Sequence, residues 1–309
     1  MVDDISGLTR KVYESQHEKY AADKDSYQRI YDMYNNAPWP MSKEWFKGKK
    51  ALDAGCGNVG CLILWLFHQG IENVYGIDIG NEWIKKLKSN LVKKGISQSK
   101  LKLQPGNVLN IPFEDNYFDF VSINGILVHL NNVQEIKDAF KEGARVLKQG
   151  GYYFTTYGVS GGLFTDAVLP AIQKYYKDNI YFKELIDNIS PKKIHGIFDF
   201  IVKEHLQQTG EHIEPEHIKT IKSLFGVDYC VFLQNYIQRP TDFSSICTPE
   251  FVESLYEENG FHSIVRQSYY VKRKDIRKFL APLHYSKNEL ISKAFYGGQG
   301  AVNYIGVKK

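Results

Sequence analysis

Hydrophobic and polar residues alternate with two periods between residues 49 and 157. Short apolar runs typical of buried strands are each followed by stretches whose apolar residues recur every three or four positions, as in amphipathic helices. The predicted strands are 51–52, 74–77, 101–104, 118–123 and 152–156, and the predicted helices are 61–68, 83–94 and 133–147. Strands that alternate with helices predict an α/β fold with a doubly wound, mostly parallel sheet.

The alternation stops after about residue 158. Residues 160–240 show no clear strand pattern, and the helical stretches in them are 167–176, 182–189, 194–208, 217–225 and 229–237. Sheet patterning returns at Thr248 with a helix start that has Pro249 in its first turn and a stop at Gly260. Strands at 263–271 and 301–307 then bring the expected sheet to seven strands.

The segment before the first strand has the spacing of an amphipathic helix over residues 8–46, until Pro38 and Pro40 break it. The predicted parts of the chain are an N-terminal helical arm or lid at 1–47, a Rossmann-like core at 48–158, a helical insertion at 159–245 and a C-terminal part of the core sheet at 246–309. An insertion after the fifth strand lies over the carboxyl ends of the strands, where open α/β folds bind ligands. We therefore expect a helical cap that walls a substrate pocket and excludes water.

Composition narrows the class of protein without naming it. With 309 residues, 43% hydrophobic and 24% charged, the chain is ordinary for a globular protein, and its net charge of +4 is too mild to indicate nucleic acid or a membrane. The four cysteines form no C-x-x-C pair, so we expect reduced, packed thiols and no metal site. The start of the chain lacks an apolar signal segment, and the longest apolar run, 61–67, is too short to span a membrane. These features predict a cytoplasmic protein.

Glycines and acids meet at the ends of the first two predicted strands. Asp53 precedes Gly55, Gly57 and Gly60, which fit the spacing G-x-G-x-x-G, and Asp78 ends the second strand. Glycine lets the backbone approach a ligand closely, and the helix that follows directs N–H groups toward an anionic group. A downstream acid is placed to hold ribose hydroxyls. The turn predicts a nucleoside-like ligand, and taken alone it fits a dinucleotide equally well.

Five motifs in order resemble those of class I S-adenosylmethionine-dependent methyltransferases of the small-molecule type. They read D-A-G-C-G at 53–57, Y-G-I-D-I-G at 75–80, G-N-V-L-N-I-P-F at 106–113, F-D-F-V-S-I-N-G-I-L-V-H-L at 118–130 and A-F-K-E-G-A-R-V-L-K-Q-G-G at 139–151. The resemblance covers about 49–157 and resumes over 248–308. It implies S-adenosylmethionine as cofactor and a seven-stranded sheet with an antiparallel last strand. Nicotinamide oxidoreductases share the glycine turn but not the later motifs.

The resemblance also implies which residues surround the cofactor: Asp53, Gly55, Cys56, Gly57, Asp78, Ile79, Trp83, Asn107, Val108, Asn124 and Gly125. The backbone of 55–57 would pack against the methionine part, and Asp53 would orient that turn or reach the methionine amine through water. The chain around Asn124 and Gly125 would hold that amine at the end of the fourth strand.

On the nucleoside side, Asp78 would accept both ribose hydroxyls and Trp83 would cover the adenine. Asn107, with the amide of Val108, would recognise the adenine edge. The chain departs from the family pattern at two of these places. Val59 stands where a glycine is usual, with Gly60 one position later, and Asn107 stands where many members have aspartate.

Two further residues are candidates for the reaction itself. His129 follows the fourth strand, where the transferred methyl group would lie, and could accept a proton from an attacking hydroxyl or amine. The alternative is that His129 only packs against the ligands. The N-terminal tyrosines could cover the cofactor, with Tyr20 the best candidate, although for most of them an aromatic stripe that docks the arm on the core is the expected role.

The leading hypothesis is a methyltransferase for a small or medium-sized acceptor, methylated at oxygen, nitrogen or carbon. A first alternative acts on RNA or a nucleotide-linked acceptor, because basic residues cluster at 272–278. A second is an inactive partner subunit that binds the cofactor, although Asp53 and Asp78 are both present. The acceptor, the methylated atom and the oligomeric state stay open.

Overall fold

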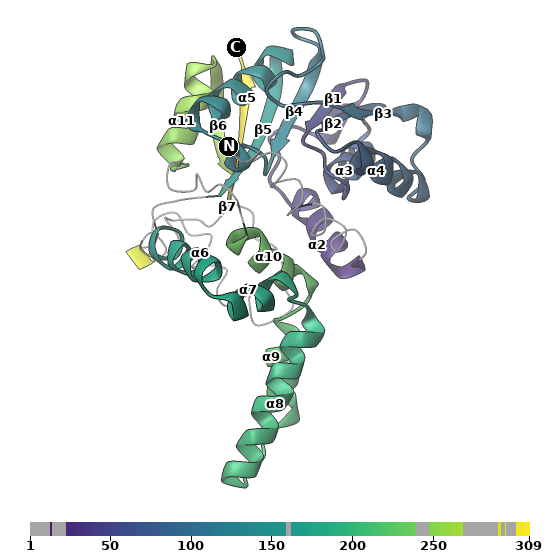
Figure 1. The fold of residues 1–309 in the computed structure, drawn as a ribbon. Coiled ribbons are helices and arrows are strands. Elements are labelled where there is room, and N and C mark those ends of the chain that lie inside the picture. The colour runs from purple at the N-terminus through teal and green to yellow at the C-terminus, as the bar shows by residue number, and fades with distance from the viewer. Residues whose placement is uncertain are drawn as a thin grey trace.

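The computed structural model describes residue 13 and residues 23–158, 162–238, 247–267, 290–291, 294 and 301–309. Its centre is a seven-stranded sheet with the strand order β3-β2-β1-β4-β5-β7-β6 (Figure 1). The strands are β1 (Lys50–Ala54), β2 (Asn73–Asp78), β3 (Leu101–Pro105), β4 (Phe118–Asn124), β5 (Leu147–Gly158), β6 (Phe261–Gln267) and β7 (Ala301–Lys308). The first five strands are parallel, and β7 runs antiparallel to both β5 and β6. This confirms the predicted α/β sheet and its antiparallel last strand.

Helices pack on both faces of the sheet. On one face, α2 (Lys24–Asn35), α3 (Cys61–Gln69) and α4 (Asn81–Lys93) share a buried cluster with Ala51, Val74 and Phe120 of the strands. On the other face, α5 (Val133–Val146) and α11 (Pro249–Glu258) pack on Leu52 and Val121. Successive residues of β1 thus point to opposite faces, as the period of a strand requires. The short 3-10 helices are η1 (Lys43–Phe46), η2 (Gln98–Lys100) and η3 (Leu127–His129).

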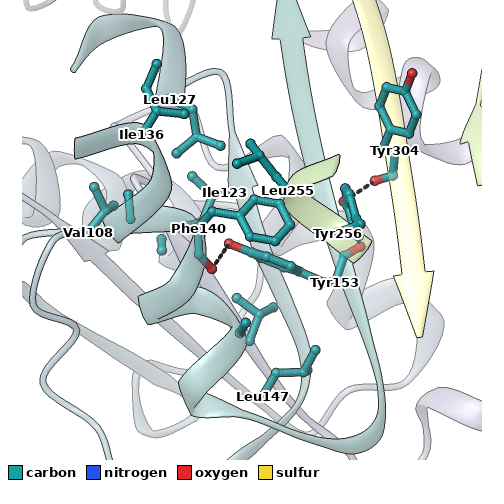
Figure 2. Packing of buried hydrophobic residues seen from close by; sticks show 14 of the residues in the cluster. Val108, Ile123, Leu127, Ile136, Phe140, Leu147, Tyr153, Leu255, Tyr256 and Tyr304 are labelled. Carbon is teal, nitrogen blue, oxygen red and sulfur yellow. Dashed lines mark hydrogen bonds between the residues drawn. The ribbon is translucent and has the colours of Figure 1, made fainter. Parts of the chain in front are cut away.

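The second face has an aromatic centre, shown in Figure 2. Phe140, Tyr153 and Tyr256 are completely buried there. The Tyr153 hydroxyl donates to the carbonyl of Phe140 at 3.2 Å, and the Tyr256 hydroxyl donates to the carbonyl of Tyr304 at 3.0 Å. The same Tyr256 oxygen lies 2.7 Å from Oγ1 of Thr155. Because these phenols have partners, α11 can be fixed to β5 and β7 without leaving buried polar atoms unsatisfied.

Several element boundaries differ from the sequence prediction. The predicted helix 133–147 ends at Val146, since Leu147 takes extended backbone angles (φ −82°, ψ 135°), and β5 starts there, five residues before the predicted strand. Strand β6 starts at Phe261, two residues early, and its predicted end lies outside the described residues. Of the helix predicted over 8–46, the described residues show α2 up to Asn35, three residues before Pro38.

The predicted helical insertion is present between β5 and α11. It begins with a π-helical turn, η4 (Phe164–Val168), and its helices are α6 (Leu169–Asp178), α7 (Ile180–Asp187), α8 (Pro191–Thr209), α9 (Pro215–Ser223) and α10 (Val227–Ile237). Ile186, Ile194, Cys230 and Ile237 are among the residues of a separate small core. Figure 1 shows α6, α7 and α10 grouped below the sheet, while α8 and α9 extend away from it. No helix among the described residues is both long and apolar enough to cross a membrane.

Candidate cofactor and acceptor site

A cavity of about 630 Å³ lies at the carboxyl ends of β1, β2 and β4. The residues that the sequence predicted around the cofactor all line this cavity except Tyr20, which lies outside the described residues. His129 lines the cavity as well. The cavity also extends to α10, so residues of both the core and the helical insertion line it.

Strand β2 holds the glycine turn that follows β1. The N–H groups of Gly55 and Cys56 both donate to the carbonyl of Ile77, at 2.8 and 3.1 Å. The N–H of Gly57 donates to Oδ2 of Asp78 at 2.9 Å. Asp78, the acid expected to bind ribose, therefore also orients the turn. The resemblance had implied that Asp53 could have this role.

Gly55, Gly57 and Gly60 of this turn all have left-handed backbone angles, and at Gly55 and Gly60 a side chain would also collide with a neighbour. Gly55 has a φ of +82°, and a Cβ built on it would lie 2.3 Å from Cγ1 of Ile126. Gly60 has a φ of +71°, and its Cβ would lie 2.4 Å from Cδ1 of Leu87. Gly60 is the residue immediately before α3, so the displaced glycine next to Val59 supplies the left-handed helix start at this one position.

Two buried carboxyl groups face each other across β1 and β2. Asp78 is almost fully buried, and burial raises its pKa, although its Oδ1 accepts the N–H of Gly80 at 3.0 Å. Burial and the neighbouring charge of Asp78 raise the pKa of Asp53 to about 7. Both shifts have the sign of carboxyl groups withdrawn from water without a cation beside them. A positively charged ligand in this cavity would favour the ionised form of both.

The start of α4 forms an aromatic wall. The Trp83 ring is buried and lies so close to Gly80 that a Cβ there would be 2.6 Å from the ring. Ile79, between β2 and α4, is 47% exposed and lines the same part of the cavity. A flat indole beside an exposed aliphatic side chain suits the faces of an aromatic heterocycle.

The loop after β3 brings Asn107 and Val108 to the cavity. Oδ1 of Asn107 accepts the N–H of Leu109 at 3.0 Å, which closes a tight turn. A carbonyl oxygen has two lone pairs, so the side chain can still accept a further hydrogen bond. The substitution of asparagine for the usual aspartate thus keeps an oxygen acceptor here and fixes its position locally.

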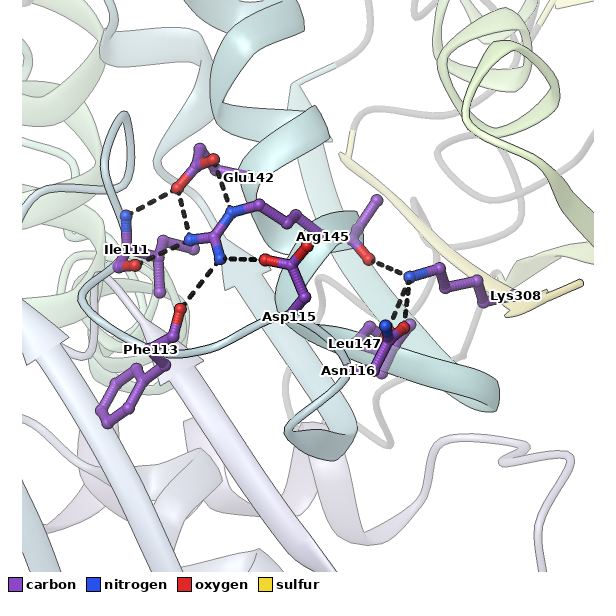
Figure 3. A network of polar contacts seen from close by, with 9 residues as sticks. Ile111, Phe113, Asp115, Asn116, Glu142, Arg145, Leu147 and Lys308 are labelled. Carbon is purple, nitrogen blue, oxygen red and sulfur yellow. Dashed lines mark hydrogen bonds and ion pairs between the residues drawn. The ribbon is translucent and has the colours of Figure 1, made fainter.

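Arg145 of α5 anchors this loop from behind (Figure 3). Its Nη2 donates to the carbonyl of Ile111 at 2.8 Å, and its Nη1 donates to the carbonyl of Phe113 at 2.9 Å and to Asp115 at 2.7 Å. Glu142 accepts from Arg145 and from the N–H of Ile111, at 2.8–2.9 Å. These carboxylates raise the pKa of the guanidinium, which stays charged. Several charge-assisted hydrogen bonds in one network make the loop a fixed wall of the cavity.

The arm contacts the site where β4 ends. Asn124 donates from Nδ2 to the hydroxyl of Tyr34 of α2, and Gly125 follows with a φ of +69°. Of the tyrosines in the arm, Tyr27 and Tyr34 are buried in the core cluster and Tyr31 hydrogen-bonds His68, as expected for a docking stripe.

Tyr13 of the arm lies against His129. Its hydroxyl is 3.1 Å from Nδ1 of His129, and the two ring centroids are 4.5 Å apart. Tyr13 is 7% exposed and lines the cavity. The sequence signalled Tyr13 only as one member of the tyrosine stripe, because the contact spans 116 residues.

Four other residues that line the cavity were not predicted from the sequence as site residues: Thr156 and Tyr157 of β5, and Asn235 and Tyr236 of α10. Oδ1 of Asn235 is buried and has no hydrogen-bond partner among the described residues, and the buried Tyr157 hydroxyl lies beside the side chain of Thr155. Burial and the nearby Tyr256 hold the pKa of Tyr157 well above its usual value, so it stays a protonated phenol. The tyrosine at 236 was visible in the sequence as part of an aromatic-rich insertion.

The other chemical candidates stay structural. Cys56, Cys61, Cys230 and Cys247 are all free and buried, as expected. Among the described residues, no cluster of three histidine, cysteine or acidic side chains could hold a metal ion. The basic cluster at 272–278 lies outside the described residues.

The strand order, the antiparallel β7 and the acids at the ends of β1 and β2 together define the fold of a class I methyltransferase. Residues 52–155 match a family model described as a methyltransferase domain. The chain therefore contains a class I S-adenosylmethionine-dependent methyltransferase domain, and S-adenosylmethionine is the cofactor of that domain.

Curated relatives share this domain rather than the whole chain. A demethylmenaquinone methyltransferase from Geobacillus stearothermophilus is 38% identical over 106 residues, which cover 34% of this chain and 43% of that protein. The same-named protein from Staphylococcus epidermidis is 37% identical over 106 residues, 34% of this chain and 41% of that protein. The chain thus matches less than half the length of each.

Solved structures align over more of the chain at low identity. A possible histamine N-methyltransferase from Thermotoga maritima is 12% identical with a TM-score of 0.48, covering 99% of this chain and 100% of that one. A geranyl diphosphate methyltransferase in complex with S-adenosylmethionine is 13% identical with a TM-score of 0.46, covering 92% and 86%.

Proposed function

We propose that this chain is an enzyme that transfers the methyl group of S-adenosylmethionine to a small or medium-sized organic acceptor. The observation that carries the proposal is one cavity whose walls include both the motif loops of β1, β2 and β4 and the side chains of α10 and residue 13. The bound cofactor supplies an electrophilic methyl group. The protein then has to position the acceptor and exclude water, and a cavity bordered by a helical insertion suits both tasks.

The residues present fit the cofactor. The left-handed Gly55, where a Cβ would collide with Ile126, leaves bare backbone at the turn, as close approach of a ligand requires. Each carboxylate oxygen of Asp78 accepts one N–H, and each has a further lone pair for a ribose hydroxyl. We assign Asp78 to the ribose, Asn107 with the Val108 amide to the adenine edge, and Asp53 to the methionine amine.

We assign the acceptor to the side formed by Tyr157 and Asn235. The buried Oδ1 of Asn235, which has no partner among the described residues, carries a cost of about 1–3 kcal/mol that an acceptor with a matching donor would relieve. The Tyr157 phenol stays protonated and can donate, while Oδ1 of Asn235 can only accept. The proposed acceptor therefore carries an oxygen or nitrogen that accepts from Tyr157 and an O–H or N–H that donates to Asn235.

We further propose that His129 takes up the acceptor proton, with Tyr13 fixing its tautomer. In this arrangement Nδ1–H of His129 donates to the Tyr13 oxygen, which makes Nε2 the basic site of the ring. Tyr13→Phe removes this partner but keeps the ring contact. It should lower kcat more than it raises KM and shift the acidic limb of the pH profile. Unchanged kcat and pH profile in Tyr13→Phe would contradict the assignment.

The test of the activity uses S-adenosylmethionine labelled in its methyl group. The purified protein is incubated with a small-molecule extract, a demethylated menaquinone and total RNA in separate reactions. Label in a small organic product supports the proposal. Label in RNA would replace it by the nucleic-acid alternative. Tight binding of S-adenosylmethionine by calorimetry with no transfer to any acceptor would favour the inactive partner subunit.

A further inference from the structure

The paired helices α8 and α9 have little to hold their outer half in place. Ile194 is the sole buried residue of the 19-residue α8, and none of α9 is buried. The inner end of α8 packs into the small core through Ile194 and Phe198. Beyond that point α8 and α9 extend away from the rest of the molecule (Figure 1). Most of the stability of a helix in a protein comes from burial against other elements. A packing partner would therefore stabilise the outer half of α8 and α9.

The outward face of α8 is apolar in its middle. Ile197, Phe200 and Ile201 are 44%, 62% and 50% exposed. Phe200 and Ile201 lie three and four residues after Ile197, so both are neighbours of Ile197 on one side of the helix. Scattered exposed apolar residues are normal, but a helical stripe of three large ones on a projecting element marks an interaction surface.

The stripe is bounded by opposite charges. Lys193 lies four residues before Ile197, and Glu204 lies four residues after Phe200, so the spacing along the helix is four, three, four. That is the spacing of core positions where two helices pack along their length. Among the described residues, neither Lys193 nor Glu204 forms an ion pair.

We propose that this stripe is the interface of a homodimer, in which α8 packs antiparallel on α8 of a second copy about a twofold axis. Under that symmetry Lys193 lies opposite the second copy's Glu204, and Ile197 lies opposite the second copy's Phe200. The pattern is self-complementary, as an isologous interface requires. Two ion pairs flank an apolar centre, and both form at once.

Charge farther along the paired helices agrees with the antiparallel arrangement. The inner end carries Lys192 and Lys193, whereas the outer loop carries Glu211 and Glu214; Lys219 and Lys222 of α9 already pair with Glu216 and Asp199. Antiparallel docking places the basic end of one pair on the acidic end of the other. An anionic membrane surface would be repelled by the acidic outer end, so a second copy of this chain fits the surface better than a membrane does.

The size of the surface is also adequate. A helix of 19 residues is about 28 Å long. With α9 beside it, such a face buries on the order of 1,000 Å² in total when two copies meet, at the low end of specific interfaces. We therefore expect a reversible dimer with a micromolar dissociation constant.

The test is sedimentation of the full chain over a range of concentrations. The wild type should form a species of twice the 35.6 kDa chain mass. Lys193→Glu and Glu204→Lys each turn two attractive contacts into repulsive ones, and each should weaken the dimer about tenfold or more. An equimolar mixture of these two variants should dimerise again, because each contact then joins Glu to Lys. The double variant Lys193→Glu/Glu204→Lys should also dimerise.

Two further variants make the result decisive. Phe200→Glu should give a monomer with unchanged circular dichroism, and Tyr181→Glu, at an 81% exposed site on α7, should leave the dimer intact. A wild type that is monomeric at about 100 µM would overturn the proposal. So would a dimer that persists in Phe200→Glu, or single charge variants whose mixture fails to associate. None of these outcomes depends on methyl transfer, so the dimer and the proposed activity stand or fall separately.

Discussion

Asp78→Ala separates the two tasks assigned to Asp78, holding the glycine turn and binding the cofactor. The substitution leaves the N–H groups of Gly57 and Gly80 without their acceptor, at about 1–3 kcal/mol each. Burial raises the pKa of Asp78, so its removal recovers part of that burial cost. We expect a net loss of about 2 kcal/mol in the free energy of unfolding, and with it a fall in Tm of about 4–8 °C.

The loss in cofactor binding should be larger than the loss in stability. Hydrogen bonds to a charged group contribute about 1.5–3 kcal/mol, so losing both ribose hydroxyls raises the Kd for S-adenosylmethionine about 100-fold or more. Thermal unfolding gives the first quantity, and isothermal titration calorimetry gives the second.

Asp119→Ala is the matched control. Asp119 is also a carboxylate on a core strand, and it accepts the N–H of Lys50 at 3.0 Å and pairs with Lys148 at 3.1 Å. It lies at the start of β4, at the opposite end of the sheet from the cavity. Asp119→Ala should lower Tm by a similar amount and leave the Kd unchanged. The reasoning is refuted if Asp78→Ala binds the cofactor like the wild type, or if both variants lose affinity equally.

Three more predictions follow from the same geometry. Gly55→Ala places a Cβ 2.3 Å from Cγ1 of Ile126 at a φ of +82°. The free energy of unfolding, measured in urea, should fall by about 2–4 kcal/mol, and cofactor binding should be lost. A variant as stable as the wild type would contradict this prediction. Because the folded-state pKa of Asp53 is raised from 3.8 to about 7, its carboxyl favours the folded state at low pH, and this contribution is lost as the pH rises through that window. The cationic cofactor favours the ionised carboxyl, so its Kd should fall between about pH 6 and 8 with proton release, measurable by calorimetry in buffers of different ionisation enthalpy; a Kd and proton count independent of pH would refute this. Arg145→Met should speed hydrogen exchange at 106–117 and weaken cofactor binding, whereas unchanged exchange there would show that the loop does not need its anchor.

The grouping of the motif residues at one edge of the sheet was predictable because each motif is local in sequence. The glycine turn, the acid after β2 and Asn107 all stand within a few residues of a strand end, and strand order then brings them together. Apolar spacing also sufficed for the order of helices and strands. The apolar spacing misplaced the start of β5. It assigns Leu147 to the end of a helix, but Leu147 pairs with Phe118 in the sheet and belongs to the strand.

The acceptor side could not be predicted in the same way. Tyr13 meets His129 across 116 residues, and Asn235 reaches the cavity through the packing of α10. Nothing in the local pattern distinguishes Tyr13 from the tyrosines that only dock the arm. The hydrogen bond from Gly57 to Asp78 was missed for the same reason, since it joins two strand ends and not two neighbours in sequence.

The residues that line the cavity come from two different parts of the chain, and this has a consequence for how such proteins can diversify. The motif loops lie within the matched stretch 52–155, while Tyr13, Tyr34, Asn235 and Tyr236 come from outside it. Under the proposed function, mutation or replacement of the insertion should change which acceptor is methylated while the residues of 52–155 keep their hydrogen bonds. A chimera carrying another protein's insertion in place of 162–238 should retain cofactor affinity and change acceptor choice. Such a result would make the insertion a part of the molecule that can be exchanged without changing the side that binds the donor.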